Sequence, residues 1–283
     1  MEQIMKGITL ITFTRNSSKR LQGLLEGVKD LVDEIIIVDG YSTDDTVEIA
    51  LSYGSKVYRR KPWGYVEPDR MFAVRKASYD WILCLDDDER LGTRLKQDLR
   101  GLVEGCEPAV SAFSITRFNI LPNGTPLLGI FYPDKQIRVY RKDKVLYKGL
   151  VHEHPTIYGG IKYLPDEYHI IHMIYEGFFS MEKTVRYAYF TALEYHTLKA
   201  KNKLRIALYK SAPLSTLPFF FYLLMWGMMR RKPMNLKSVL YTFKNSVYES
   251  LASTLINFRG EKRSKIAKVV EEKGLIQLLG LDS

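Results

Sequence analysis

Cysteine is scarce in this sequence of 283 residues, and no stretch of the sequence is repetitive or of low complexity. The two cysteines, Cys84 and Cys106, exclude a fold held together by several disulfides and indicate a reducing compartment. Hydrophobic residues make up 46% of the chain and charged residues 26%, which excludes a disordered or collagen-like protein. The length predicts one large domain or two small ones.

Several motifs that define common classes of protein are also absent. The chain has no G-x-x-x-x-G-K-[ST] and no G-x-G-x-x-G, which disfavours a P-loop NTPase and a Rossmann-type dinucleotide enzyme. It has no serine-centred nucleophile elbow, and no H-E-x-x-H or cysteine pair supports a zinc site. The apolar run at residues 8–13 is too short for a signal peptide and is followed by Arg15, so no signal peptide is expected.

Acidic residues are few in the last third of the chain. Residues 1–198 hold 26 Lys and Arg against 27 Asp and Glu, whereas residues 199–283 hold 16 against five, a net charge of +11. The same third contains an uncharged run, residues 212–229 (APLSTLPFFFYLLMWGMM). Lys210 precedes this run and the basic triplet at residues 230–232 follows it.

A basic, aromatic and apolar segment favours contact with a membrane surface. The run of 18 residues is near the lower limit for a spanning helix, and Pro213 and Pro218 interrupt its start. The preferred interpretation is a helix in the interface, with a buried core helix and a true span as alternatives. Nucleic acid is not expected, because phosphate binding needs interleaved cations. The prediction is a peripheral protein at the cytoplasmic face of a membrane, docked through residues 200–283.

The first hundred residues alternate between predicted strands and helices. Apolar runs predict buried strands at residues 7–13 and 34–38, and further strands are predicted at residues 56–58 and 81–85. Helical spacing, capping residues and a proline predict helices between Leu21 and Val32, over residues 44–53 with Ser42 or Thr43 as its cap, over residues 69–79, and from Thr93 onward. Later segments predict strands at residues 110–118 and 136–140 and a long helix over residues 180–201.

Polar residues follow three of the predicted strands. Alternating strands and helices imply a parallel sheet with right-handed crossovers, and ligands bind beyond the carboxyl ends of such strands. The polar clusters at these ends are residues 14–16 (TRN), 39–42 (DGYS) and 86–89 (DDDE). We expect them to converge on one crevice.

The cluster of four consecutive acids at residues 86–89 is electrostatically unusual. Such close carboxylates repel, and one has a raised pKa unless a cation neutralises it. One interpretation is a solvated loop that caps the next helix. The other is a site for a hard divalent cation, Mg²⁺ or Mn²⁺, beside a diphosphate. Arg15, Arg70 and Arg138 are available as basic partners.

These motifs, in this order, resemble the family 2 glycosyltransferases with the GT-A fold. Members typically read T-K-N-E, V-D-S-G-S-T-D-x-T, Q-R-N and L-D-A-D-E, matched here by TRN, VDGYSTDDT, the lone Arg70 and LDDDE. Residues 151–153 (VHE) are similar to a motif of the lipopolysaccharide-core subgroup of bacterial glucosyltransferases. The resemblance covers residues 7–172, is strongest in its first half, and is loose over residues 200–283.

The resemblance implies an α/β fold of the GT-A type, which is Rossmann-like, with a mostly parallel sheet flanked by helices. This catalytic domain is expected over residues 1–198, with a helical, basic, membrane-associated region over 199–283. The implied activity is inverting, metal-assisted transfer of a sugar from a nucleotide-diphosphate sugar, preferably linked to UDP. The implied acceptor is a lipid-linked or cell-surface glycan.

The resemblance also assigns roles to individual residues. Nucleotide-sugar binding is implied for Thr14, Asn16, Asp39, Arg70, Asp86 and Glu89. Asp39 falls where the family contacts the base, and Asp88 is the first choice as a ligand of Mg²⁺ or Mn²⁺. Asp86, near the ribose or the metal, and His152 complete the implied metal set. Glu153 is the first choice for the catalytic base, with His152 as a metal or diphosphate ligand, although these two roles could be exchanged.

The sequence departs from the family pattern at several positions. Ser17 stands where the family has Glu, and Asp87 stands where it has a small residue and is expected to add charge to the metal site. Tyr41 changes the base pocket and leaves uracil specificity open. A nucleotidyltransferase is an alternative, but residues 12–19 lack the usual glycines. A non-catalytic basic adaptor at a membrane is another, but it leaves the acid cluster unexplained.

Overall fold

The structure is a computed structural model that describes residues 5–63, 65–149, 153–174 and 235–257, with single positions at 188, 220, 221 and 225. Two compact units make up the chain. The first comprises Met1–Leu127 and Phe131–Tyr175, and the second comprises Leu128–Ile130 and Glu176–Ser283. The domain boundary predicted after residue 198 and most of the helix predicted over 180–201 lie outside the described residues.

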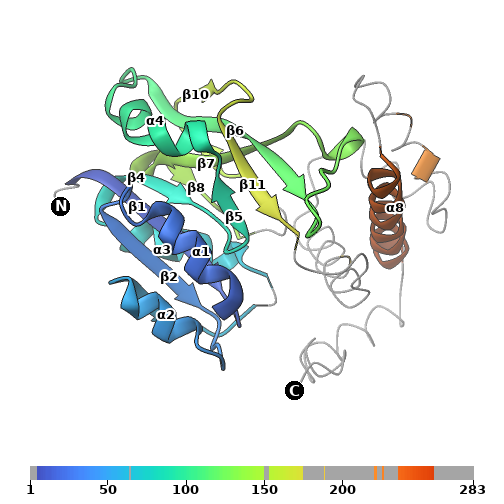
Figure 1. Ribbon diagram of the computed structural model, residues 1–283, viewed down its shortest axis with the longest axis horizontal. Coiled ribbons are helices and arrows are strands. Elements are labelled where there is room, and N and C mark those ends of the chain that lie inside the picture. Colours follow the sequence, from blue (N-terminus) through green and yellow to red (C-terminus); the bar gives the residue numbers. More distant parts are fainter. Residues whose placement is uncertain are drawn as a thin grey trace. The chain divides into compact units, whose positions relative to one another are not determined.

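Four parallel strands form one half of the large sheet in the first unit (Figure 1). They are β1 (Met5–Thr14), β2 (Glu34–Asp39), β3 (Lys56–Arg59) and β4 (Tyr79–Cys84), in the spatial order β3-β2-β1-β4. The helices that connect them are α1 (Ser18–Val28), α2 (Thr46–Ser52) and α3 (Glu67–Lys76). The predicted alternation and the predicted parallel sheet are confirmed.

The other half of the sheet is mixed. Strand β4 pairs antiparallel with β7 (Asp134–Arg141), and β7 pairs antiparallel with β6 (Val110–Ile120). Strand β6 is parallel to β11 (His169–Met173), which pairs antiparallel with β5 (Glu89–Leu91). The remaining elements of this unit are α4 (Thr93–Glu104), η2 (Lys142–Lys144), β10 (Gly160–Tyr163) beside β6, and a separate pair of strands, β8 (Val145–Leu146) and β9 (Thr156–Ile157).

Both faces of the sheet bury apolar side chains. Along β1, Ile8 and Leu10 belong to one core, which the apolar stripe of α1 also enters. Ile11 and Phe13 belong to the other core, with residues of α3 such as Ala73. Because the central strands are covered on both faces, their sequences are nearly continuous apolar runs rather than alternating ones.

Two details of the local predictions were wrong. Helix α3 ends before residue 79, because Ala77 is extended and Tyr79 already belongs to β4. Neither Ser42 nor Thr43 caps α2, whose N-cap position is Asp45 without a side-chain hydrogen bond. Ser42 instead donates hydrogen bonds to Asp39 from its backbone N–H and its hydroxyl.

The second unit is described mainly through α8 (Leu236–Asn257). Asn235 Oδ1 accepts a hydrogen bond from the Ser238 backbone N–H at 2.8 Å, which caps the helix. Ser238 Oγ in turn accepts the Leu128 N–H at 2.7 Å, which ties residues 128–130 and the adjoining η1 (Gly129–Phe131) to α8. Among the helices of the described residues, none is long and apolar enough to cross a membrane. Most of the predicted interfacial run, residues 212–229, lies outside that part of the chain.

The Asp44 carboxylate stabilises the first turns of two helices. Its Oδ2 accepts the Ser18 N–H of α1 at 3.1 Å, and its Oδ1 accepts the Thr46 N–H of α2 at 3.2 Å. Partial burial opposes ionisation, but these bonds and that of the Thr46 hydroxyl outweigh it and lower the pKa of Asp44 to about 2. The carboxylate is therefore ionised at neutral pH.

We expect Asp44→Ala to lower the free energy of unfolding by about 1–2 kcal/mol, because two helix caps are lost. The matched control Asp45→Ala, which removes no side-chain cap, should change it by less than about 0.5 kcal/mol. The lowered pKa means that the wild-type advantage holds above pH 4 and disappears as the pH falls through about 2. Urea unfolding at pH 7 and pH 2 measures both effects, and equal losses in the two variants would contradict the double cap.

Candidate active site

The three polar clusters meet at the carboxyl edge of the parallel strands. The Asn16 backbone N–H donates to Ser42 Oγ at 2.9 Å, and the Thr43 N–H donates to Asn16 Oδ1 at 2.9 Å. These bonds join the loops after β1 and β2. Ser17 Oγ donates to the Asp87 carboxylate and joins the loop after β1 to the acid cluster. The three clusters thus meet, as predicted, and the acid cluster also lines a cavity through Asp86.

Asp39 is fully buried at the end of β2. Its Oδ1 accepts the Thr14 hydroxyl at 3.1 Å, and its Oδ2 accepts the Ser42 N–H at 2.9 Å. The Arg59 Nε lies 3.6 Å from Oδ2 and supplies the neutralising cation. The structure thus brings together Thr14, Asn16 and Asp39, three of the residues predicted to bind the nucleotide.

Asp86 and Glu89 share the guanidinium of Arg138. Its Nη2 lies 2.6 Å from Asp86 Oδ2 and 2.6 Å from Glu89 Oε1. Arg117 reaches the same Glu89 oxygen at 3.2 Å, and Arg70 lies 3.5 Å from Asp86 Oδ1. Burial alone would raise the pKa of Asp86, but the charges of the three arginines hold it well below its usual range. Cations therefore contact both oxygens of the Asp86 carboxylate.

The other two acids of the cluster have different partners. Asp87 accepts hydrogen bonds from Ser17 Oγ and from Arg20 Nη2, the latter at 2.9 Å, and burial raises the pKa of its carboxyl group. Asp88 Oδ2 lies 3.5 Å from Nε2 of His172. Asp87 and Asp88 thus have partners of their own, whereas Asp86 and Glu89 share Arg138.

Two departures from the family pattern are explained by one contact. We expected Asp87 to add charge to the metal site, and in the structure its carboxylate bonds to Ser17 and Arg20. A glutamate at position 17, which the family usually has, would place a second anion against Asp87. Serine at 17 and aspartate at 87 therefore form a matched pair.

A cavity of about 230 Å³ lies beside Asp86. Its lining residues are Glu67, Arg70, Asp86, Arg117, Gln136, Ile137, Arg138, Tyr147, Glu153, His154 and Pro155. Glu153, the predicted base, thus lies in the same cavity as two of the predicted donor-binding residues. His152, the predicted metal or diphosphate ligand, lies outside the described residues.

The Glu153 carboxylate also closes a turn of the backbone. The Lys148 N–H donates to its Oε1 at 2.8 Å and its Oε2 at 2.7 Å, and the Gly149 N–H donates to Oε2 at 2.7 Å. A carboxylate offers about four lone pairs, so these bonds orient Glu153 without using all its acceptor capacity.

Arg70 is fixed among aromatic rings at the wall of the cavity. Its guanidinium carbon lies 5.2 Å from the Phe13 ring centroid and 5.6 Å from that of Tyr147, and its Nη1 lies 3.1 Å from Cys84 Sγ. Burial alone would lower the pKa of Arg70, but its neighbours, including Asp86, raise it. A permanent, oriented cation results.

The sequence did not predict that His172 lies beside Asp88 of the acid cluster. Asn119 Nδ2 donates to Asp134 Oδ2 and to the Phe131 carbonyl, each at 3.3 Å, which fixes the orientation of the amide. Asn119 Oδ1 therefore faces His172 Nδ1 at 2.7 Å, so the ring donates Nδ1–H and, when neutral, turns the Nε2 lone pair toward Asp88. The available signal was a histidine within the apolar strand β11.

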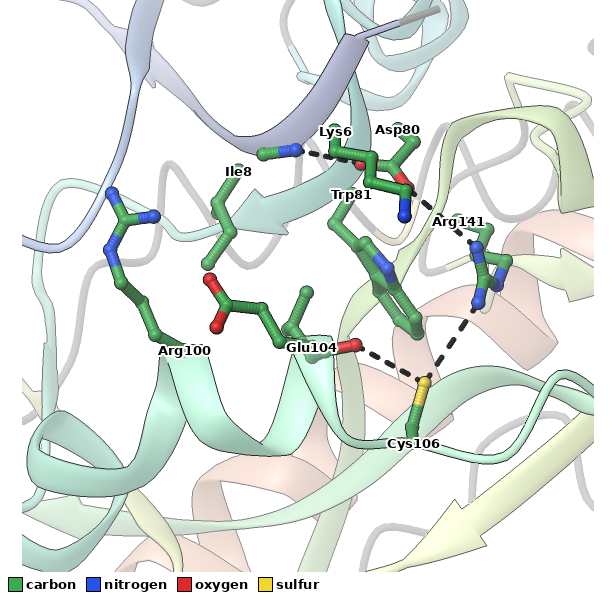
Figure 2. A pocket seen from close by; sticks show the side chains of 10 residues that line it. Lys6, Ile8, Asp80, Trp81, Arg100, Glu104, Cys106 and Arg141 are labelled. Carbon is green, nitrogen blue, oxygen red and sulfur yellow. Dashed lines mark hydrogen bonds and ion pairs between the residues drawn. The ribbon is translucent and has the colours of Figure 1, made fainter.

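Another cavity, of about 310 Å³, lies at the amino ends of β1 and β4 (Figure 2). Figure 2 shows Arg141 beside Trp81 with bonds to Asp80 and Cys106. The arginine lies 4.7 Å from the indole centroid. None of the predicted site residues lines this cavity, so we do not assign it to the active site.

The first unit is an α/β domain with a mostly parallel sheet, and acids and arginines cluster at the carboxyl edge of its strands. Residues 9–181, more than half of the chain, match the family model Glycosyl transferase family 2, and the chain belongs to this family. This membership favours glycosyl transfer over the nucleotidyltransferase and adaptor alternatives. The lipopolysaccharide-core subgroup remains a prediction.

Two similar curated proteins are named as glycosyltransferases. The uncharacterized glycosyltransferase RT0209 of Rickettsia typhi is 36% identical over 141 residues, which span 49% of this chain and 47% of that protein. RP128 of Rickettsia prowazekii is 42% identical over 96 residues, 34% of this chain and 32% of that one. The chain thus spans less than half the length of these curated relatives. A crystal structure of S. aureus TarS 1–349 with UDP gives a TM-score of 0.46 at 16% identity, over 86% of this chain and 91% of that one.

We expect Arg138→Met to lower the free energy of unfolding at pH 7 by about 3 kcal/mol, because the buried Glu89 and the partly exposed Asp86 lose their shared cation. Without Arg138 the pKa of Asp86 should rise, so protonation relieves the penalty and the loss should be smaller at pH 5. The control Arg141→Met, whose partner Asp80 is 3.7 Å away and partly exposed, should cost about 1 kcal/mol or less. Urea unfolding at both pH values tests this, and a loss independent of pH would contradict it.

Proposed function

We propose that the protein is an inverting glycosyltransferase that moves a sugar from a nucleoside diphosphate sugar, preferably a UDP sugar, to a lipid-linked or cell-surface glycan. The observation that supports this most directly is the network joining Asp86 and Glu89 to Arg138 at the carboxyl edge of the sheet. Ligands bind at this edge in α/β proteins. Membership of glycosyl transferase family 2 supplies the reaction class.

Asp88 and His172 are the residues that fit a divalent cation. Asp88 Oδ2 and His172 Nε2 lie 3.5 Å apart, and a carboxylate oxygen and an imidazole nitrogen can both be ligands of a divalent cation. In the described residues no group of three or more His, Cys, Asp or Glu is placed to hold a metal. Two protein ligands are enough for Mg²⁺ or Mn²⁺ when substrate phosphates and water complete the shell. A bound cation would neutralise charge on the departing diphosphate.

We expected Asp86 also to bind the metal, but its contacts suit the orientation of two arginines instead. Its two oxygens contact Arg138 and Arg70, so it orients these two cations toward the cavity that they line. Fixed cations stabilise a leaving group whose negative charge grows in the transition state. We therefore assign Asp86 and Glu89 to positioning the arginines that contact the donor.

Glu153 is our choice for the base. In an inverting reaction the acceptor hydroxyl attacks the anomeric carbon from the side opposite the diphosphate, and its proton passes to a carboxylate oxygen. The backbone bonds of residues 148 and 149 hold Glu153 in the cavity lined by Asp86 and Arg70. His152 remains the alternative base or a further metal ligand.

A thermal-shift measurement tests the donor and metal proposals together. UDP with Mn²⁺ at about 100 times the dissociation constant should raise the melting temperature by about 3 °C or more. Asp88→Asn should lose the metal-dependent part of this rise. The control Asp87→Asn should keep it, because residue 87 bonds to Ser17 and Arg20 instead.

Two results would count against these assignments. If the folded protein shows no shift of its melting temperature with UDP, GDP, CDP or ADP, the proposed nucleotide-sugar donor is wrong. If the shift is equally large in the presence of EDTA, the proposed metal is wrong and the proposed donor stands.

We also propose that residues 199–283 dock the enzyme on the cytoplasmic face of a membrane, where a lipid-linked acceptor would lie. Their net charge of +11 supports this, because each basic residue near an anionic surface contributes about 1 kcal/mol. The described helices contain no membrane span, and peripheral docking needs none.

Vesicle sedimentation of the full chain tests the docking. Binding to vesicles with anionic lipid should exceed binding to zwitterionic vesicles and should fall with salt. Replacing Arg230, Arg231 and Lys232 by Ser should weaken binding at least tenfold. The control replaces three exposed lysines of the first unit, Lys19, Lys29 and Lys96, and should bind like the wild type. If both triple variants bind the vesicles equally weakly, binding depends only on the net charge of the protein, and docking through residues 199–283 is contradicted.

A further inference from the structure

Tyr41 has a backbone conformation that aromatic residues rarely adopt. Its φ is 56°, in the left-handed region, and in the described part of the chain only Asn16 shares this among residues other than glycine. Asparagine tolerates this region because its short side chain bonds locally, and Asn16 does so with the Thr43 N–H. A bulky ring gains nothing comparable, so the conformation of Tyr41 is a strained one.

The side chain of Tyr41 faces solvent at the nucleotide end of the proposed site. It is 53% exposed and follows the buried Asp39 by two residues. The ring of Tyr41 thus lies largely in solvent at the edge of the sheet.

One neighbour holds the ring in place. The guanidinium carbon of Arg59 lies 5.3 Å from the ring centroid of Tyr41, a cation–π contact. Arg59 is itself fixed by Asp39 at 3.6 Å and by the Ser42 carbonyl at 3.2 Å. In the described residues no hydrogen-bond partner is recorded for the Tyr41 hydroxyl. The contacts thus orient the ring without burying it. An exposed ring on a strained backbone adds little to the stability of the fold, but it suits a surface that binds a ligand.

We propose that the Tyr41 ring stacks on the base of the donor nucleotide. The inference rests on the proposed function, since it requires a nucleotide at this edge. A flat ring, held from one side by Arg59 and largely open to solvent, suits the π face of any base. Stacking of this kind adds affinity without choosing the base, so base preference would come from hydrogen bonds elsewhere. Tyr41 would then be a binding residue of the donor and not part of the chemistry.

Tyr41→Gly separates this role from a structural one, because the two predict opposite changes. Glycine adopts φ near 56° without strain, so the variant should melt at the wild-type temperature or above it. Its affinity for UDP in the presence of Mn²⁺, measured by calorimetry on the full chain, should fall by about tenfold. Tyr41→Phe keeps the ring and should stay within about twofold of wild type.

Two controls locate the effect on the base. Inorganic pyrophosphate, which has no base, should bind wild type and Tyr41→Gly equally well. Tyr163→Ala removes another exposed ring, 70% exposed on β10, and should leave UDP binding unchanged.

The outcomes separate this inference from the proposed function. If wild type binds UDP and Tyr41→Gly binds it equally well, the stacking role is wrong and the donor proposal stands. If Tyr41→Gly binds both pyrophosphate and UDP more weakly than wild type, the substitution disturbs the loop and not a contact with the base. That result would also overturn the stacking role. If the folded wild type binds none of the nucleoside diphosphates, the proposed function fails and the stacking role with it.

Discussion

The ion pairs of Arg138 with Asp86 and Glu89 join three strands of the sheet. Arg138 lies on β7, Asp86 follows β4, and Glu89 begins β5, so one guanidinium connects the parallel half of the sheet to the mixed half. Two carboxylates this close would repel each other in a buried setting without a shared cation. Asp86, Arg70 and Arg138 all line the cavity, so its charged wall depends on this arrangement.

The parts of the fold that local sequence determines were predictable. Strands β1, β2 and β4 are largely apolar because helices cover both faces of the sheet, and the polar residues Thr14, Asp39 and Asp86 at their ends mark the edge where loops leave it. The order of these polar ends along the chain was enough to predict that they meet. Their meeting needed only the parallel arrangement, which the alternation with helices implies.

The other half of the site depends on contacts that no local pattern encodes. His172 reaches Asp88 because β11 pairs with both β6 and β5, and β5 has only three residues. Asn119, which orients His172, is 53 positions away in the chain. The Ser17–Asp87 pair is of the same kind, since each residue taken alone was a departure from the family pattern and only their contact explains them. Long-range pairing of short strands is the step at which sequence reasoning failed.

The loops after β1 and β2 are bonded to each other at several points, through Asn16 with Ser42 and Thr43, and through Asp44 with Ser18. Each bond joins a side chain of one loop to the backbone or side chain of the other. A substitution in one loop therefore disturbs the other, and a compensating change must follow there. We therefore expect these loops to covary in evolution, with substitutions that are accepted in pairs across them and not in either loop alone.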